Sequence, residues 1–291
     1  MHTPLLKAFT VIAETGSVSL AAEKMHLTQP SISKRLAALE SELGQRLFDR
    51  VGRKLGLTDA GRSLLPHAHR VLQEIEDARR TLSHLSTEIK GRLSIGTSHH
   101  IGLHRLPPVL RRYTQRHPAV DLDLHFMDSE VACEAVLAGK LELGIVTLPS
   151  QALPNLKTQK VWDDPLDVVV HAGHPLAGKR KLRLADLAAH PAVLPDAATY
   201  THRIIRVALQ KHGLEPRVRL ATNYLETLKM LVSIGLGWSV LPRSMLDDSL
   251  RVLKLPELKL HRELGAVWHE RRSLSAAAKA LVAQLSALKP R

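Results

Sequence analysis

The chain has very little cysteine and few aromatic residues. It contains one cysteine, Cys133, and three residues each of Trp, Tyr and Phe among 291. A lone cysteine cannot close an internal disulfide, and it has no partner to resolve an oxidised thiol. We therefore expect Cys133 to be a small buried residue in a protein of a reducing compartment.

Long apolar runs are also missing. The most apolar window, residues 231–242, contains Ser233, Gly235 and Gly237 and is too short to span a bilayer. The first residues have no basic segment, and Glu14 interrupts the apolar stretch that a signal peptide needs. The sequence therefore predicts a cytoplasmic protein that does not contact a membrane.

The charge balance is strongly positive. Lys and Arg number 41 against 28 Asp and Glu, a formal net charge of +13, which points to a polyanionic partner such as nucleic acid. Residues 1–90 hold 13 basic and 10 acidic residues, whereas residues 91–291 hold 28 and 18. Most of the surplus lies in the longer C-terminal part, which favours an acidic ligand there or DNA passing along it. The length predicts two domains or one large one.

Capping residues predict three short helices within residues 1–44. Pro4 suits the first turn of the first helix, and the third has an apolar stripe that begins at Ile32. The second and third helices are joined by a tight turn at residues 26–27, which describes a helix-turn-helix. The expected caps are Thr3, Ser17 or Ser19, and Thr28, and the expected left-handed ends are Gly16 and Gly44.

Two short extended runs, residues 47–50 and 55–57, flank a basic tip and predict a β-wing. Polar residues on one side of the third helix can bond base edges or phosphates, and basic residues of the wing can contact the backbone or minor groove. The alternative for these side chains is a solvated polar surface. The candidate DNA contacts are Gln29, Ser31, Ser33, Lys34, Arg35, Arg50, Arg53 and Lys54.

Residues 58–90 predict one long helix with a heptad seam. A continuous helix of 33 residues would be about 50 Å long, with a kink near Pro66. The seam favours dimerisation, and the alternative is an amphipathic helix packed on its own domain. Its residues are Leu64, Ala68, Val71, Ile75, Ala78, Leu82, Leu85 and Ile89.

Strands and helices alternate after Gly91, which predicts a parallel sheet with crossover helices in two lobes of similar size. The expected strands include residues 92–97, 121–126 and 141–146 in the first lobe, and 166–170, 192–194, 217–221 and 238–241 in the second. The fold class is therefore α/β.

A ligand pocket is expected between the lobes, at the carboxyl ends of strands and the first turns of helices. Hydroxyl, amide and imidazole groups at such positions could bind a small, acidic ligand. Each of these residues by itself is also an ordinary cap or turn former. The candidates are Thr97, Ser98, His99, Ser129, Thr147, Thr199 and Asn223.

We expect no metal site, cofactor or catalytic centre. Adjacent His99 and His100 would point to opposite faces of a strand, and His67 and His69 do not share a helix face. We find no His-x3-His pair, no Cys-x2-Cys pair and no Gly-x-Ser-x-Gly elbow.

The run from Ala21 to Gly61 resembles the LysR-type transcriptional regulators. The resemblance rests above all on Ala21-Ala22 and on Leu27-Thr28-Gln29-Pro30-Ser31-Ile32-Ser33, and it continues through Leu47-Phe48, Arg50 and Leu57-Thr58-Asp59-Ala60-Gly61. The long helix and two-lobed module that follow extend it over the whole chain.

The resemblance implies a winged helix-turn-helix at 1–57, a linker helix at 58–90 and a periplasmic-binding-protein-like effector domain at 91–291. With crossovers near Asp163 and Gly265, lobe I would comprise 91–162 and 266–291, and lobe II 163–265. It implies a homotetramer, a dimer of dimers, that regulates transcription under control of a small effector, with RNA polymerase as a further candidate partner. It also supports Thr97, Ser98, Thr147 and Thr199 as effector contacts, although His99 and His100 depart from the small hydroxyl residues usual there.

Three other functions would make different demands on the chain. A small-molecule binding protein for transport would need an export signal and no helix-turn-helix. An enzyme using the cleft would need a catalytic constellation. A constitutive DNA-binding protein with an empty sensor domain would not gain stability from any effector.

Overall fold

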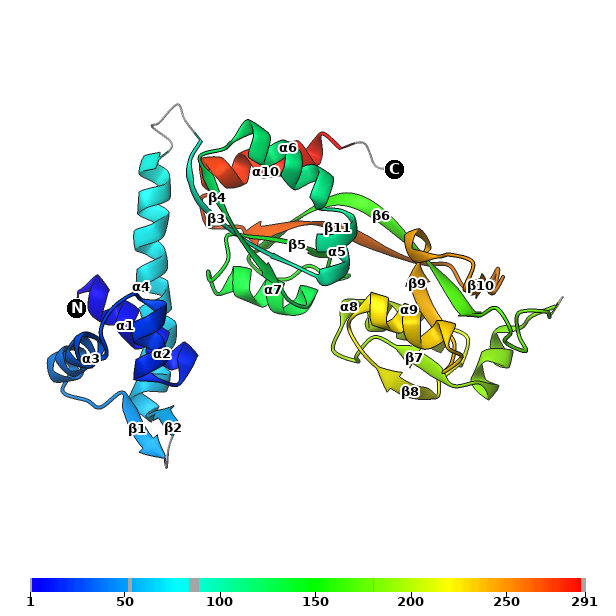
Figure 1. Cartoon of the computed structure of the whole chain (residues 1–291), viewed down its shortest axis with the longest axis horizontal. Helices are drawn as coiled ribbons and strands as arrows, with labels where there is room; N and C mark the ends of the chain where they lie inside the picture. Colours follow the sequence, from blue (N-terminus) through cyan, green and yellow to red (C-terminus); the bar gives the residue numbers. More distant parts are fainter. Residues whose placement is uncertain (1, 52–53, 84–88, 180, 289–291) are drawn as a thin grey trace. The chain divides into compact units, whose positions relative to one another are not determined.

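The computed structural model describes residues 2–51, 54–83, 89–179 and 181–288. The chain divides into two units, Met1–Leu85 and Ser86–Arg291, and each is described by itself (Figure 1).

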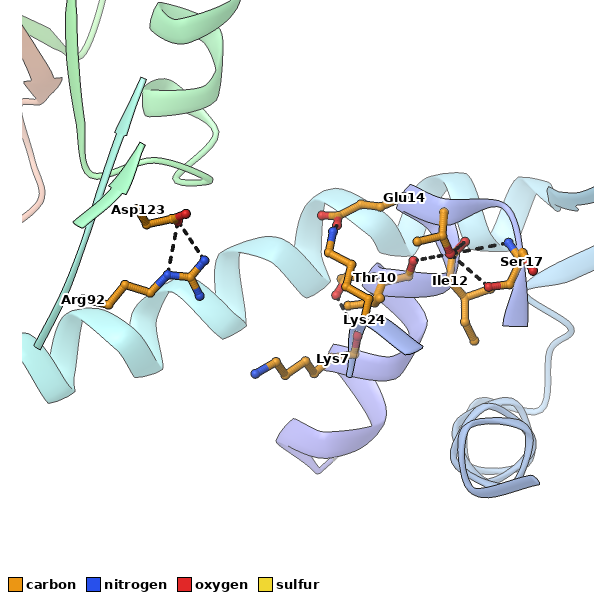
Figure 2. Close-up of polar contacts among 10 residues, drawn as sticks. Lys7, Thr10, Ile12, Glu14, Ser17, Lys24, Arg92 and Asp123 are labelled. Carbon is orange, nitrogen blue, oxygen red and sulfur yellow. Dashed lines mark hydrogen bonds and ion pairs between the residues drawn. The ribbon is translucent and has the colours of Figure 1, made fainter. Parts of the chain in front are cut away.

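The N-terminal unit packs three short helices and a hairpin against the start of a longer helix. α1 contacts α2, α3 and α4, and its Leu6, Phe9 and Ile12 are fully buried in the shared core. Lys24 Nζ lies 3.0 Å from Glu14 Oε2, which adds an ion pair between α2 and α1 (Figure 2). The elements are α1 (Thr3–Thr15), α2 (Val18–Lys24), α3 (Gln29–Leu43), β1 (Phe48–Val51), β2 (Lys54–Leu57) and α4 (Asp59–Ser83).

The helix ends follow the capping residues with two exceptions. Gly16 and Gly44 adopt the left-handed conformation, with φ of 63° and 65°, and Ser17 accepts a hydrogen bond from Leu20 N. Thr3 is not a cap, because α1 begins one residue earlier and Leu5 N donates to His2 O. Thr28 stands at the N-cap of α3, but its side chain makes no capping bond.

The long helix is shorter than the sequence predicted. α4 runs through Pro66 to Ser83, so its 25 residues span about 37 Å. Residues 84–88, which include Leu85 of the expected seam, lie outside the described residues, and residues 89–90 are not helical.

The C-terminal unit is built on a seven-stranded sheet in the order β10-β6-β11-β5-β3-β4, with β9 also paired to β6. β3 pairs in parallel with β4 and β5, as predicted, but β11 runs antiparallel to both β5 and β6, and β9 and β10 are antiparallel to β6. The prediction of a purely parallel sheet is therefore wrong: the sheet is mixed. A separate parallel pair, β7 and β8, completes the second half of the unit.

The strands of this unit are β3 (Gly91–Thr97), β4 (Val120–Phe126), β5 (Leu143–Thr147), β6 (Leu156–His171), β7 (Ala192–Leu194), β8 (Val218–Ala221), β9 (Ser239–Pro242), β10 (Leu250–Val252) and β11 (Leu260–His269). The helices are α5 (His99–His104), α6 (Pro107–Arg116), α7 (Ser129–Leu137), α8 (Tyr200–Gln210), α9 (Leu225–Ser233) and α10 (Ala276–Ser286), with the 3-10 turns η1 (Leu184–Ala189) and η2 (Arg243–Met245).

Two long strands connect the halves of this unit. β6 has 16 residues and β11 has 10, and all of β11 pairs with the part of β6 from Leu156 to Leu166, with an irregularity between Leu264 and Gly265. After β11 the chain returns to the first half, where α10 packs on α6 and β3 (Figure 1). Arg92 of β3 reaches Asp123 of β4, with Nη2 2.7 Å from Oδ2 (Figure 2).

Each half has its own main apolar core. Leu93, Tyr113 and Leu281 belong to the core of the first half, whereas Val168 and Trp238 belong to the core of the second. Separate cores joined by two strands allow the halves to keep their internal packing while the space between them changes.

Among the helices that the structure describes, none by itself is long and apolar enough to cross a membrane. Only α1 and α2 together pass that test of length and composition, and they are bent by 117° at their junction.

Candidate nucleic-acid interface and ligand cleft

The third helix exposes a polar face because its apolar residues point into the N-terminal core. Ile32 and Leu39 are fully buried. Gln29, Ser33 and Lys34 are exposed, and Ser31 and Arg35 are half-buried. Ser19 Oγ of α2 donates to Gln29 Oε1 at 3.3 Å, a contact across the two helices of the motif. The turn between them includes His26 at φ 53°, a conformation that few non-glycine residues adopt.

The wing is a short antiparallel hairpin. Phe48 pairs with Leu57 and Val51 with Lys54, so two residues connect β1 to β2. Arg50 and Lys54 lie in these strands, while Arg53 at the tip lies outside the described residues. The start of α4 holds the hairpin in place, because Thr58 Oγ1 donates to Arg46 O at 2.7 Å and accepts from Gly61 N at 3.0 Å.

The expected seam of α4 leaves the N-terminal core partway along the helix. Ala68 is buried and Leu64 packs beside it, but Val71 is 41% exposed and Ala78 is exposed. This exposed half of the seam is available to a second helix.

Six of the seven expected ligand contacts line one cleft of the C-terminal unit. Its cavity of about 50 Å³ has room for a few water-sized groups. Ser98, His99, Ser129, Thr147, Thr199 and Asn223 all line it. Thr97 does not, because it is fully buried and its hydroxyl donates to Ile145 O at 2.8 Å.

Side chains from the two halves meet across this cleft. Asn223 Nδ2 donates to Asp128 Oδ2 at 2.7 Å, and Glu130 accepts a hydrogen bond from Tyr200 N. The His99 ring packs on Tyr224, with 4.8 Å between centroids. Polar and aromatic contacts therefore bridge the two halves at this cleft.

Several of the predicted hydroxyls support the fold as well. Ser129 Oγ accepts from Thr147 N at 3.0 Å, and Thr199 Oγ1 caps α8 by accepting from His202 N at 3.1 Å. Ser98 precedes α5, but its side chain makes no capping bond. Unlike Ser129 and Thr199, Ser98 therefore makes no hydrogen bond that supports the start of its helix.

A buried cationic network forms the floor of the cleft, and sequence reasoning missed it. Arg262 of β11 is 5% exposed and donates from Nε to Asp164 Oδ2 at 2.7 Å and from Nη1 to Thr201 Oγ1 at 3.1 Å. Arg105 Nη2 donates to Asp164 Oδ1 at 3.1 Å. Arg262 Nη2 is buried without a hydrogen-bond partner among the described residues. Two guanidinium groups share one carboxylate, so the network has a net charge of +1.

The strand pattern contains the signal that would have found this pair. Arg262 lies between Leu260 and Leu264 on the buried face of β11, and Asp164 lies between Trp162 and Leu166 on that of β6. Opposite charges on two alternating apolar faces predict a buried ion pair. The first half of β6 and all of β11 were absent from the expected elements.

Burial shifts the pKa of two groups in the cleft. Loss of hydration, with a contribution from Arg262, lowers the pKa of His100 to about 4 although Asp164 and Glu226 act in the other direction. Burial also raises the pKa of Glu130 above its usual value, against the hydrogen bond from Tyr200. At neutral pH His100 is therefore an uncharged imidazole.

Two expectations about histidine are wrong. His99 and His100 belong to α5 rather than to a strand, and the chain does contain a His-x3-His pair, His100 and His104. Their ring centroids are 4.9 Å apart, because residues four apart share a helix face. Glu226 lies beside both.

Cys133 lies in the interior of the C-terminal unit, as expected. It is fully buried on α7, and burial raises the pKa of its thiol to about 11. A buried, protonated thiol reacts slowly with oxidants.

Known families match both units. The family described as "LysR substrate binding domain" matches residues 86–289, and "Bacterial regulatory helix-turn-helix protein, lysR family" matches residues 4–62. The first match alone covers more than half of the chain.

Relatives matched over most or part of the chain carry regulator names. The chain is 30% identical over 282 residues to the "Uncharacterized HTH-type transcriptional regulator YeiE" of Escherichia coli strain K12, covering 94% of each protein. It is 61% identical over 108 residues to an "Uncharacterized HTH-type transcriptional regulator in ibpB-leuC intergenic region" of Azotobacter vinelandii, which covers 37% of this chain and 75% of the relative.

Solved structures share the fold. The chain matches a full-length variant of OxyR from Pseudomonas aeruginosa with a TM-score of 0.74 at 22% identity, covering 99% of this chain and 96% of that one. It matches full-length CbnR in complex with its target DNA with a TM-score of 0.66 at 22% identity, covering 98% of each.

Proposed function

The chain belongs to the LysR family of DNA-binding transcriptional regulators, and on that premise we propose that its α3 face reads operator DNA while its cleft binds a small anionic effector. The family pairs a DNA-binding helix-turn-helix with an effector-binding domain, and this chain has both. The partners that follow are double-stranded DNA and a metabolite-sized acid.

The DNA contacts that we propose are Gln29, Ser31, Ser33, Lys34 and Arg35 of α3, with Arg50, Arg53 and Lys54 of the wing. The support is that the core holds Ile32 and Leu39 while the opposite side of α3 stays polar and open. Gln can bond adenine and Arg or Lys can bond guanine in the major groove, whereas the wing residues suit phosphates.

Footprinting upstream of the protein's own gene tests this interface. We expect a protected region at moderate salt, and we expect Gln29→Ala and Arg35→Ala to change which sequence is protected. Lys259→Ala in the C-terminal unit is the control, because it removes one positive charge far along the chain from α3. No protected region, or equal effects of all three substitutions, would contradict the proposal.

The observation that carries the effector proposal is the unpartnered Nη2 of Arg262 in a cleft of convergent hydroxyls. A buried N–H of a charged group without an acceptor is costly, and a carboxylate or phosphate oxygen would supply that acceptor. Ser98, Ser129, Thr147, Thr199 and Asn223 offer further polar contacts from both halves, with His99 at the rim. Asp128 and Glu130 in the same lining favour an acid that also carries hydrogen-bond donors.

Calorimetric titration of the full chain with a panel of small hydroxy and amino acids, each paired with its amide, tests the effector class. An acid should bind and raise the melting temperature, and its amide should not. Ser98→Ala should weaken binding by several-fold, and Ser233→Ala on α9 outside the cleft should not. If the amides bind as tightly as the acids do, Arg262 does not select an anion.

Binding between the halves would control DNA binding only through a difference in affinity between two arrangements. We propose that the chain forms a homotetramer, a dimer of dimers, with the exposed half of the α4 seam in a dimer contact, so that the effector changes the spacing of its DNA-binding pairs. RNA polymerase is then the partner that senses this change, in the cytoplasm. On this proposal the cleft binds without catalysing a reaction. Sedimentation of the parent and of Val71→Asp tests the seam, since a buried aspartate should weaken the dimer.

A further inference from the structure

Three potential metal ligands meet where α5 faces α9. His104 Nε2 is 3.0 Å from Glu226 Oε1, and His100 Nδ1 is 3.7 Å from the same oxygen. One ligand atom from each residue lies within 4.8 Å of the other two. We propose that His100, His104 and Glu226 form a binding site for a divalent transition-metal ion of the zinc class.

The distances fit tetrahedral coordination. Zn²⁺ holds imidazole nitrogen and carboxylate oxygen at about 2.0–2.1 Å, so two ligand atoms on a tetrahedral ion are ~3.3 Å apart. The two measured separations, 3.0 and 3.7 Å, lie on either side of that value. Small rotations of His104 and Glu226, which are 46% and 38% exposed, would bring the three atoms into place.

The buried histidine is the second observation that points to a ligand. His100 is 3% exposed, and neither of its ring nitrogens has a hydrogen-bond partner among the described residues. A buried polar atom without a partner costs free energy, and a metal ion would satisfy one of these nitrogens. A neutral imidazole packed on the His104 ring is the competing state, and it leaves both nitrogens unpaired.

The charges around the site permit an ion to bind. The carboxylate of Glu226 faces both imidazoles, so the three side chains offer an ion two nitrogen ligands and one anionic oxygen ligand. Arg262 opposes a nearby cation, whereas Asp164 and Glu226 favour it. Imidazole and carboxylate ligands favour Zn²⁺, Ni²⁺ or Cu²⁺ over Mg²⁺.

The site would connect the two halves of the unit. His100 and His104 come from α5 in the first half, and Glu226 comes from α9 in the second. An ion held by all three would keep α5 and α9 together, and three protein ligands leave one coordination position open. This inference depends on the three side chains alone, so it stands whether or not the effector is an acid.

Zinc titration of the untagged full chain, stripped with a chelator, tests the site. In competition with a chromophoric chelator we expect one Zn²⁺ per chain, no response to Mg²⁺, and a rise in melting temperature with zinc. His104→Ala and Glu226→Gln should each weaken zinc binding by about tenfold or more and abolish the thermal shift. Both residues are partly exposed, and alanine suits a helix, so these variants should fold like the parent.

His212→Ala is the matched control, because this exposed histidine follows α8 outside the cluster. It should bind zinc like the parent. Equal zinc binding by the parent and by the double variant His104→Ala/Glu226→Gln would show an adventitious ion on other histidines and overturn the proposal. So would a parent that binds no zinc, or an equal loss in His212→Ala.

Discussion

The polar face of α3 and the ligand cleft differ in how far apart in the sequence their residues lie. The proposed contacts of α3 lie within residues 29–35, whereas the cleft takes residues from Ser98 to Arg262, on strands, helices and loops of both halves. Residues 1–90 have a net charge of only +3, and residues 91–291 have +10. We therefore expect DNA recognition to depend on the positions of a few charged side chains rather than on the net charge of the chain.

The two regions also differ in what supports them. The α3 face is exposed and rests on an apolar core, whereas the cleft floor is a buried network of two arginines and one aspartate. Substitutions should therefore cost more in the cleft than in the DNA-binding unit. The three tryptophans, Trp162, Trp238 and Trp268, all lie in the C-terminal unit, so their fluorescence follows the unfolding of that unit alone.

The largest effect should come from Asp164→Asn. It leaves the buried guanidinium of Arg262 and the partly buried one of Arg105 without a carboxylate, which should lower the free energy of unfolding of the C-terminal unit by about 3–5 kcal/mol. Urea unfolding followed by tryptophan fluorescence measures it. Asp163→Asn, which removes an exposed ion pair with Lys160 on the same strand, should change that transition by about 1 kcal/mol or less. An unchanged midpoint for Asp164→Asn would mean that the buried network does not stabilise the cleft.

Gly265→Ala should have the next largest effect. A Cβ at Gly265 would overlap the backbone oxygen of Gln159, where β11 and β6 shift register, and such overpacking costs about 1–3 kcal/mol. The same tryptophan-monitored unfolding measures this loss. Gly178→Ala in the same unit is the matched control, because a Cβ there meets nothing within 4 Å. A stable Gly265→Ala protein would show that the two connecting strands can separate at little cost.

Lys34→Ala should have a smaller effect, on DNA binding alone. If Lys34 contacts a phosphate, its loss should flatten the dependence of log affinity on log salt by about one unit. Fluorescence anisotropy of labelled operator DNA at several salt concentrations measures the slope. Lys259→Ala changes the net charge equally and should leave the slope alone; matching slopes for the two variants would show that total charge, not placement, drives binding.

The smallest effects should come from the helix caps. Ser17 caps α2 and Ser275 caps α10, and Ser275 is also buried and bonded to Glu142. We expect about 1–2 kcal/mol for Ser275→Ala and about 0.5–1 kcal/mol for Ser17→Ala. Tryptophan fluorescence reports the first, and loss of operator binding with temperature reports the second. A larger loss of stability for Ser17→Ala than for Ser275→Ala would show that substitutions cost more in the DNA-binding unit than in the C-terminal unit.

The DNA-binding unit could be predicted from the sequence because its signals are local. Gly16 and Gly44 end helices where only left-handed residues fit, Ser17 caps α2, and Ile32 fixes which side of α3 faces the core. The first strands and helices after Gly91 followed from their periodicity in the same way. The missed elements include α5, only six residues long, the first half of β6, the short β10, and β11, whose buried Arg262 breaks an apolar pattern.

The sequence alone determined the family resemblance, the winged helix-turn-helix and six residues of the cleft lining, because each depends on residues close together in the chain. Only the tertiary structure decided that the sheet is mixed and that the Thr97 hydroxyl donates to Ile145 O. It also decided that Asp164 accepts hydrogen bonds from two arginines, and that Glu226 lies beside His100 and His104. These contacts join residues as many as 126 positions apart, His100 and Glu226 among them, and no local period encodes such a pairing. Packing of β6 against β11 and of α5 near α9 brings them together.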